Sequence, residues 1–232
     1  MDLSIVKSCS IASAIFQFKD DFSDYNYVDL NCPKHKIIYF LPNDCIPSYE
    51  HCRENVFAGL DLCPLFPPTV NIKRPIQFKE KNLNILITPG ANGSQFAEKL
   101  IEKILIFKNK INIKIFSSKY PKIISNNLNL IDGSDGLEKY IMFSDLVITA
   151  GGNTMLESIF LGTPTIAFST NKNQINLLNF LNNKNDILYI KNLQNLEYAF
   201  FNFYLKKKIF FRKNQYFKKF SYERMINLIT RI

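Results

Sequence analysis

The chain has 232 residues, 47% of them hydrophobic, and carries a formal net charge of +9. This length and apolar content allow one large or two small domains with a buried core, and they argue against global disorder. No apolar run reaches the roughly 20 residues that span a bilayer, and the N-terminus does not fit a signal peptide. The charge favours an anionic partner, although a lysine-rich composition spread over many segments explains it equally.

The cysteines argue for a reducing environment. An odd number without CxxC spacing fits neither a disulfide framework nor a zinc site. We therefore predict free thiols, a cytoplasmic location, no metal site and no cofactor. All five lie in the first part of the chain: Cys9, Cys32, Cys45, Cys52 and Cys63.

The first 75 residues carry a weak and irregular pattern. The pattern predicts a short helix followed by two strands, over residues 5–16, 36–41 and 56–65. Prolines then favour extended, non-helical backbone, which is typical of a linker, at Pro67, Pro68 and Pro75. We therefore expect residues 1–75 to form a short, incomplete N-terminal segment and a linker.

From residue 76 to residue 232 the pattern becomes regular. Apolar, β-branched runs predict strands over residues 84–88, 111–116, 128–131, 146–149, 165–168 and 187–190. Helical periodicity between them predicts helices over residues 95–108, 136–143, 154–161, 174–181 and 195–205, with a mostly helical tail. Strands that alternate with helices through short connections predict an α/β fold with a doubly wound parallel sheet.

Residues 145–164, DLVITAGGNTMLESIFLGTP, combine a buried strand, a glycine turn and a helix. Gly151 and Gly152 let the backbone turn sharply and approach a ligand closely, because glycine has no Cβ. A turn that leads into a helix N-terminus gathers free N–H groups and the positive end of the helix dipole. The stretch therefore predicts a phosphate-binding turn.

The boundaries of this helix also follow from the sequence. Thr154 and Glu157 have the T-x-x-E spacing of a capping box, which predicts that the helix begins at Thr154. Gly162 can adopt the left-handed conformation that ends a helix, and Pro164 forbids continuation.

A second glycine turn, residues 89–94, contains Gly90 and Gly93 and follows another predicted strand. Ser94 can cap the helix after it. Both glycine turns lie at the carboxyl ends of predicted parallel strands, where ligands bind in such sheets. An ordinary turn without a ligand is the alternative for residues 89–94.

The ordered set ITPGANGSQ, SDLVITAGGNTMLESIFLGTPTIAF and Asn173-Gln174 resembles the C-terminal, nucleotide-sugar-binding domain of GT-B glycosyltransferases, a Rossmann-like domain. The resemblance covers residues 84–190. It is strongest to the SpsG/PseG group, which includes the UDP-sugar hydrolase of pseudaminic acid synthesis, and more distant to MurG. Residues 57–69, FAGLDLCPLFPPT, resemble the passage by which that group leaves its N-terminal domain.

The resemblance implies a UDP-sugar ligand, with the glycine turn on the diphosphate and the Glu157 carboxylate on the ribose hydroxyls. Closure of the capping box is the structural alternative for Glu157. The resemblance also implies that the side-chain amides of Asn173 and Gln174 reach the sugar or the phosphates. It places the backbone of Gly133 and Ser134 on the uracil, and the turn at residues 89–94 at the domain cleft. The implied binding residues are Gly90, Gly93, Gly133, Ser134, Gly151, Gly152, Asn153, Thr154, Glu157, Asn173 and Gln174.

The chain departs from that family in its N-terminal part. GT-B enzymes have an N-terminal Rossmann-like domain, and the hydrolase group carries its candidate base on a glycine-rich loop ending in histidine. Here the two histidines, His35 and His51, lie outside any such loop, so no catalytic residue is identified. We expect a UDP-sugar-handling glycosyltransferase or nucleotide-sugar hydrolase, or a subunit of one, in surface polysaccharide or nonulosonic acid biosynthesis. The alternative is a non-catalytic nucleotide-sugar-binding or scaffolding subunit of a split GT-B enzyme.

The sequence suggests two further partners. A separate acceptor-binding GT-B subunit would supply what the short N-terminal segment lacks. Residues 200–220 interleave aromatic residues with lysine and arginine, so a helix there could dock peripherally on the inner, anionic membrane face. Packing of an amphipathic helix on the sheet explains the same pattern without a partner. No nucleic-acid-reading motif is recognised, so we expect no nucleic acid partner.

Overall fold

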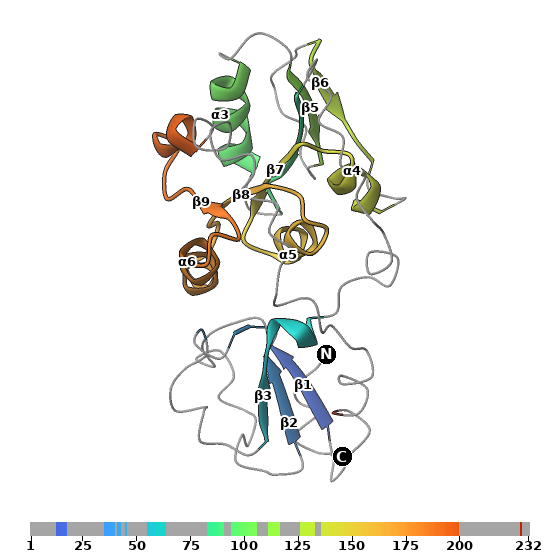
Figure 1. The fold of residues 1–232 in the computed structure, drawn as a ribbon, viewed down its shortest axis with the longest axis vertical. Helices are drawn as coiled ribbons and strands as arrows, with labels where there is room; N and C mark the ends of the chain where they lie inside the picture. The colour runs from blue at the N-terminus through green and yellow to red at the C-terminus, as the bar shows by residue number, and fades with distance from the viewer. Residues whose placement is uncertain are drawn as a thin grey trace. The chain divides into compact units, whose positions relative to one another are not determined.

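The computed structural model describes residues 13–17, 35–39, 41–42, 45, 55–63, 83–90, 94–105, 111–116, 126–132, 136–199 and 228. The chain divides into two compact units (Figure 1), Met1–Pro64 with Gln215–Ile232, and Leu65–Asn214. The predicted domain boundaries, residues 1–75 and 76–232, stay a prediction. The predicted linker prolines and the basic segment 200–220 lie outside the described residues.

The first unit contains a three-stranded parallel sheet in the order β1-β2-β3. Its strands and the helical turn that follows are β1 (Ser13–Gln17), β2 (His35–Tyr39), β3 (Val56–Ala58) and η3 (Leu60–Leu62). The predicted helix over residues 5–16 is wrong at residues 13–16, because they pair in parallel register with β2. The strand predicted over residues 56–65 ends at Ala58, where the chain turns into η3.

The second unit contains a six-stranded parallel sheet in the order β6-β5-β4-β7-β8-β9. The strands are β4 (Leu83–Thr88), β5 (Ile111–Ile115), β6 (Leu128–Leu130), β7 (Leu146–Ala150), β8 (Thr165–Phe168) and β9 (Leu188–Tyr189). The chain builds outward from β4 to one edge and then from β7 to the other. This is the doubly wound order of Rossmann folds, with its switch point between β4 and β7. The predicted α/β fold class is therefore confirmed.

Helices cover both faces of this sheet (Figure 1). They are α3 (Ser94–Leu105), α4 (Glu138–Met142), α5 (Asn153–Phe160), η4 (Lys172–Gln174), α6 (Ile175–Asn183) and a helical segment at residues 195–199. Ile85 and Ile87 of β4 pack with α3, whereas Leu86 packs with residues of α4 on the other face. Because successive side chains alternate in direction, covering both faces explains why the strands are continuously apolar.

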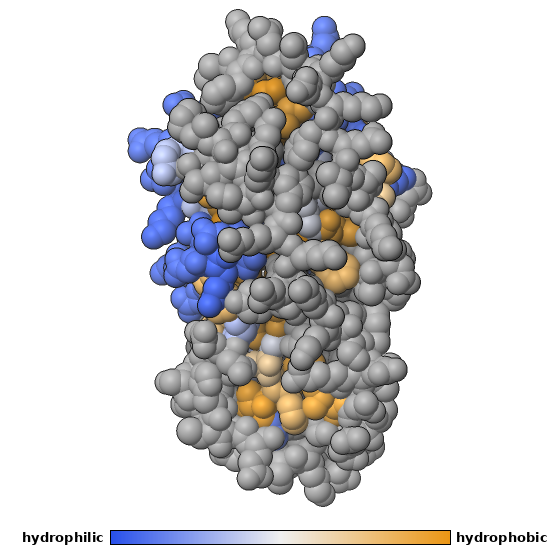
Figure 2. Space-filling model, viewed as in Figure 1, coloured by the Kyte–Doolittle hydropathy of each residue, from blue (hydrophilic) through white to orange (hydrophobic). Residues whose placement is uncertain are grey.

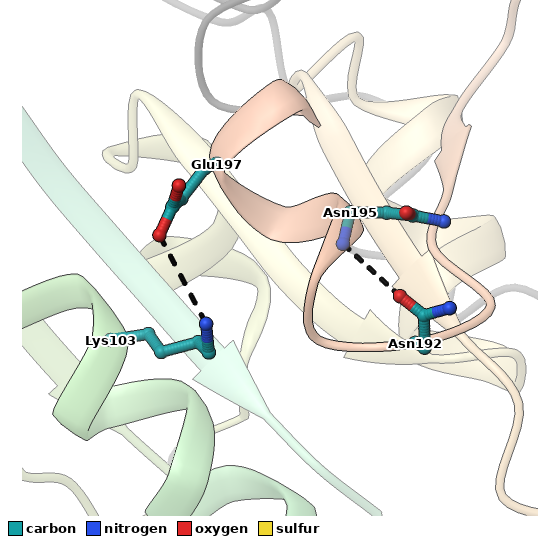
Figure 3. Close-up of polar contacts among 4 residues, drawn as sticks. All are labelled: Lys103, Asn192, Asn195 and Glu197. Carbon is teal, nitrogen blue, oxygen red and sulfur yellow. Dashed lines mark hydrogen bonds and ion pairs between the residues drawn. The ribbon is translucent and has the colours of Figure 1, made fainter.

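The last described helical segment packs beside α3. Leu196 and Ala199 belong to the same core cluster as the buried face of α3. On the outside, Lys103 Nζ lies 4.0 Å from Glu197 Oε1, and Asn192 Oδ1 accepts a hydrogen bond from the Asn195 N–H (Figure 3). Hydrophilic residues gather on this side of the unit (Figure 2). An exposed ion pair of this kind adds little stability, so the apolar contacts hold the segment.

The predicted capping box on α5 is wrong. The helix begins at Asn153, its N-cap is Gly152, and no side chain caps it. Thr154 therefore occupies the second helical position, and Glu157, only 6% exposed, is drawn inward instead of reaching back. The predicted helix end is confirmed. Gly162 has φ +69°, and the N–H groups of Gly162 and Thr163 donate to Ile159 O and Ser158 O at 3.0 and 2.9 Å, a Schellman motif.

Among the helices that the structure describes, none combines the length and the apolar character needed to cross a bilayer.

Candidate functional site

The two glycine turns lie side by side at the switch point of the sheet. Strands β4 and β7 are paired neighbours, and Gly90 and Gly151 follow their carboxyl ends. Gly90 has φ +71°, which favours glycine, and a Cβ placed on it would lie 3.4 Å from Ala150 Cβ. Ligands of doubly wound sheets bind in the crevice at this point. Gly93, the other glycine of the first turn, lies outside the described residues.

Gly151 and Gly152 are adjacent but have different surroundings. A Cβ on the buried Gly151 would lie 3.0 Å from Leu178 Cδ1, so glycine lets α6 pack against the turn. Gly152 is exposed, has extended backbone with φ −132° and ψ −158°, and a Cβ there would meet no atom within 4 Å. The fold therefore explains glycine at 151, whereas the packing of the described residues leaves space for a side chain at 152.

The turn uses some of its N–H groups internally. The Gly151 N–H donates to Phe168 O at 3.0 Å, and the Gly152 N–H donates to Ala150 O at 2.8 Å. At the start of α5, no acceptor among the described residues takes the N–H of Asn153 or Thr154. Of the four N–H groups of residues 151–154, which the sequence predicted to be free, two therefore remain free: those of Asn153 and Thr154. Two adjacent N–H groups at the positive end of a helix can bind two phosphate oxygens.

Two buried threonine hydroxyls are linked by hydrogen bonds to the backbone just before the Gly151-Gly152 turn. Thr88 Oγ1 donates to Thr149 Oγ1 at 2.7 Å, and Thr149 Oγ1 donates to Ala150 O at 3.1 Å. Thr88 and Thr149 are 3% and 1% exposed. Neither residue was predicted as part of the site from the sequence. The sequence does contain a signal, because the runs NILIT and LVIT both end in threonine. The register of β4 with β7 then places these two threonines opposite each other.

Glu157 lies in α5, one turn beyond the free N–H groups. Burial, and to a lesser extent the nearby Glu138 carboxylate, raise the pKa of Glu157 from 4.5 to about 7. No described residue donates a hydrogen bond to its carboxylate. A buried carboxylate without a donor is costly to the fold, and such perturbed groups cluster at functional sites. Its chemistry suits acceptance of hydrogen bonds from a ligand's hydroxyl groups.

The loop after β8 brings both predicted amides to the same edge of the sheet. Gln174 Oε1 accepts from the N–H and the Oγ1 of Thr170 at 2.8 and 3.2 Å. With its oxygen held in the loop, Gln174 keeps its Nε2 group as a donor. Asn173 Oδ1 is buried and has no partner among the described residues. Near the end of β8 the loop therefore holds an amide donor, Gln174 Nε2, and a buried amide oxygen without a partner among the described residues, Asn173 Oδ1.

The remaining residues that the sequence singled out lie outside the described residues or in the first unit. Gly133 and Ser134 lie outside the described residues, between β6 and α4 in the sequence, so the uracil contacts stay a prediction. His35 begins β2 in the first unit, and His51 is not described. Among the described residues, no group of three or more His, Cys, Asp or Glu could hold a metal ion.

No protein-family model matches the sequence, and no curated protein matches it. Solved structures do match. The glycotransferase of kitacinnamycin superposes with a TM-score of 0.62 at 13% identity over 84% of this chain and 54% of that one. The calicheamicin glycosyltransferase CalG4 gives 0.55 at 10% identity over 80% and 48%. The spinosyn forosaminyltransferase SpnP gives 0.51 at 12% identity over 75% and 47%.

This chain thus spans about half the length of each of these proteins. At such low identity the likeness concerns the fold, which is similar to that of GT-B glycosyltransferases, as the resemblance predicted.

Proposed function

We propose that this chain is the nucleotide-sugar-binding part of a GT-B glycosyltransferase or nucleotide-sugar hydrolase, with a UDP-sugar as its ligand. One observation carries the proposal. The unpartnered N–H groups of Asn153 and Thr154 lie beside the open position at Gly152, at the switch point of the sheet. The diphosphate binds there, because these donors match phosphate oxygens and Gly152 lets the ligand approach the backbone.

The remaining residues provide specific contacts for the rest of the ligand. The ionised Glu157 carboxylate accepts hydrogen bonds from the two vicinal ribose hydroxyls. Gln174 Nε2 donates to the sugar or the phosphates, Asn173 Oδ1 accepts from a sugar hydroxyl group, and the backbone of Gly133 and Ser134 contacts the uracil. Support for the SpsG/PseG-like assignment, and for a role in surface polysaccharide or nonulosonic acid synthesis, comes from the order of the sequence motifs.

The chemistry of this site is stabilisation of a leaving group. When the bond between the anomeric carbon and the diphosphate breaks, negative charge grows on the diphosphate, and prearranged N–H donors at the helix terminus stabilise it. The acceptor or water, and the base that activates it, come from elsewhere in the enzyme. A separate acceptor-binding subunit is one source.

The second candidate is a non-catalytic nucleotide-sugar-binding or scaffolding subunit. It is compatible with the same two N–H donors at the glycine turn, which can hold a diphosphate whether or not a bond to it is broken. Peripheral docking of residues 200–220 on an anionic membrane is compatible with either candidate, and sedimentation with phosphatidylglycerol vesicles tests it.

Titration calorimetry with UDP, UDP-GlcNAc and uridine tests the proposal. We expect UDP and the UDP-sugar to bind and uridine to bind much more weakly, because uridine lacks the phosphates. Gly152→Val should abolish binding while leaving the melting temperature unchanged, since its side chain enters open space. Asn183→Val, on the exposed end of α6, is the matched control and should bind normally. Absence of UDP binding by the wild-type chain, even together with a partner subunit, would refute the proposal.

A further inference from the structure

We infer that Thr88 and Thr149 are positioning residues for the phosphate-binding turn. Their hydroxyl chain fixes the Ala150 carbonyl, the carbonyl fixes the Gly152 N–H, and this sets the direction of the free N–H groups of Asn153 and Thr154. The inference rests on the proposed function for its ligand, whereas its effect on the turn itself can be measured without one.

The Ala150 carbonyl is the centre of this arrangement. It accepts one hydrogen bond from the Gly152 N–H at 2.8 Å and a second from Thr149 Oγ1 at 3.1 Å. The first closes a tight three-residue turn, and such a turn has no other hydrogen bond of its own. A second donor to the same oxygen restricts how the peptide group can rotate. Thr149 is itself oriented, because its other side accepts from Thr88 Oγ1 at 2.7 Å.

The turn is fixed from three neighbouring elements. The hydroxyl chain ties it to the end of β4, the bond from Gly151 N–H to Phe168 O ties it to β8, and the contact with Leu178 sets its distance from α6. The first of these ties depends on side chains alone. Valine at either position would keep the shape and the strand preference, and it would remove the polar group that must be satisfied on burial. The strand by itself therefore gives no reason for a hydroxyl.

Thr165 provides a matched control within the same sheet. It is 1% exposed and donates its hydroxyl to Thr163 O at 2.8 Å. It begins β8, so it lies at the amino edge, away from the switch point. Thr165→Val therefore removes the same kind of buried hydrogen bond, with a similar loss of stability, and leaves the turn intact.

The experiment compares Thr149→Val, Thr88→Val, Thr149→Ser and Thr165→Val. UDP affinity is measured by calorimetry, Gly152 amide exchange by NMR, and stability by thermal melting. Thr149→Val should weaken UDP binding about five- to tenfold and speed exchange of the Gly152 amide by a similar factor. Thr149→Ser keeps the hydroxyl group, so its UDP affinity and Gly152 amide exchange should stay close to wild type. Thr165→Val should melt lower, while UDP affinity and Gly152 exchange stay within about twofold of wild type.

The outcomes separate this inference from the proposed function. Unchanged Gly152 exchange in a folded Thr149→Val would overturn the positioning role, whether or not UDP binds. Faster exchange in a protein that binds no UDP would support positioning of the turn and refute the ligand. If Thr149→Val does not fold, Thr88→Val decides in the same way, because it removes the donor that orients Thr149. Equal losses of affinity in Thr149→Val and Thr165→Val would show a general stability effect and overturn the inference.

Discussion

Gly151 and Leu178 are so close that a methyl group on the glycine would lie 3.0 Å from the leucine Cδ1. Both residues are buried, and Leu178 is fully so. The adjacent Gly152 has no neighbour within 4 Å of the same position. Two consecutive glycines therefore have different surroundings: Gly151 is packed against α6, and Gly152 is open at the surface.

Substitutions at the two glycines should consequently separate stability from binding. Gly151→Ala should destabilise the protein by about 1–3 kcal/mol, because the added methyl group overpacks the contact with Leu178. Gly152→Ala should change the free energy of unfolding by less than about 0.5 kcal/mol, since its backbone is extended and exposed. Denaturant unfolding measures both values. Equal destabilisation by the two variants would contradict the distinction.

Leu178 offers a further test of the same contact. In the double variant Gly151→Ala with Leu178→Ala, the overpacking is relieved, so the combined loss should be smaller than the sum of the single losses. Residues in contact show coupling energies of about 0.5–3 kcal/mol in such cycles. Strict additivity would show that Leu178 is not what Gly151 accommodates.

Asp186, in the turn between α6 and β9, should reduce stability at neutral pH. Its Oδ2 is buried without a partner, and burial raises the pKa of Asp186 from 3.8 to about 6, partly offset by Lys184. The folded state then holds the proton more tightly than the unfolded state. Stability therefore falls as pH rises from 3.8 to about 6, and the loss is complete above about 6.

Asp186→Asn should accordingly raise the melting temperature by about 2–4 °C near neutral pH, a modest gain because solvent still reaches this side chain. The gain should disappear in scans near pH 4, where aspartate itself is mostly protonated. Glu197→Gln is the control, since this exposed carboxylate makes only a 4.0 Å ion pair and should have little effect at either pH. A gain independent of pH would point to a cause other than ionisation.

Sequence reasoning succeeded where the signal is local or is repeated along the chain. The strand predicted over residues 165–168 is observed with those bounds, because Pro164 precedes it and both faces of the sheet bury its side chains. The end of α5 was equally readable, since Gly162 alone determines the left-handed turn. Continuous apolar runs separated by helical periodicity were enough for the doubly wound fold.

The features that the sequence did not predict correctly all depend on contacts with distant parts of the chain. A short apolar run such as residues 13–17 has no distinguishing period, and it becomes a strand because β2 lies beside it. Thr88 and Thr149 are 61 positions apart and meet only through the register of β4 with β7. The T-x-x-E motif does not form a capping box. Glu157 is buried in the packed unit, and no side chain caps the helix.

The isolated chain should show little or no hydrolysis of UDP-sugars. The described site provides free backbone N–H groups, which would stabilise a leaving diphosphate under the proposed function, and no base is identified among the described residues. Release of UDP from UDP-GlcNAc, followed by a coupled assay, measures this directly. Turnover that is lost in His35→Ala or His51→Ala would identify a base in the N-terminal unit. Robust turnover that survives both substitutions would show that the catalytic group lies elsewhere in this chain.

UDP affinity should depend on pH through Glu157. Its pKa of about 7 means that roughly half of the free protein carries a neutral Glu157 at that pH. The neutral acid accepts hydrogen bonds from the ribose hydroxyls less well than the carboxylate. Affinity for UDP-GlcNAc, whose diphosphate is esterified at both ends and does not titrate in this range, should therefore rise between about pH 6 and pH 8. Glu138→Gln removes the like charge that raises the pKa of Glu157, so it should shift this rise to lower pH.

Glu157→Gln separates a ligand role from a structural one by opposite effects on binding and stability. The ionisation of Glu157 penalises the free folded state above pH 4.5, and fully above about pH 7, because its folded pKa is the higher one. Glutamine removes that penalty, so the variant should melt higher than wild type at pH 8. It also removes a charged acceptor, so UDP should bind about 10- to 150-fold more weakly there, equivalent to about 1.5–3 kcal/mol. The pH dependence of UDP-GlcNAc binding should vanish as well, because its esterified diphosphate does not titrate in this range. A variant that binds UDP like wild type at pH 8 would show that Glu157 does not contact the ribose. One that loses both stability and affinity would show instead that the carboxylate supports the fold.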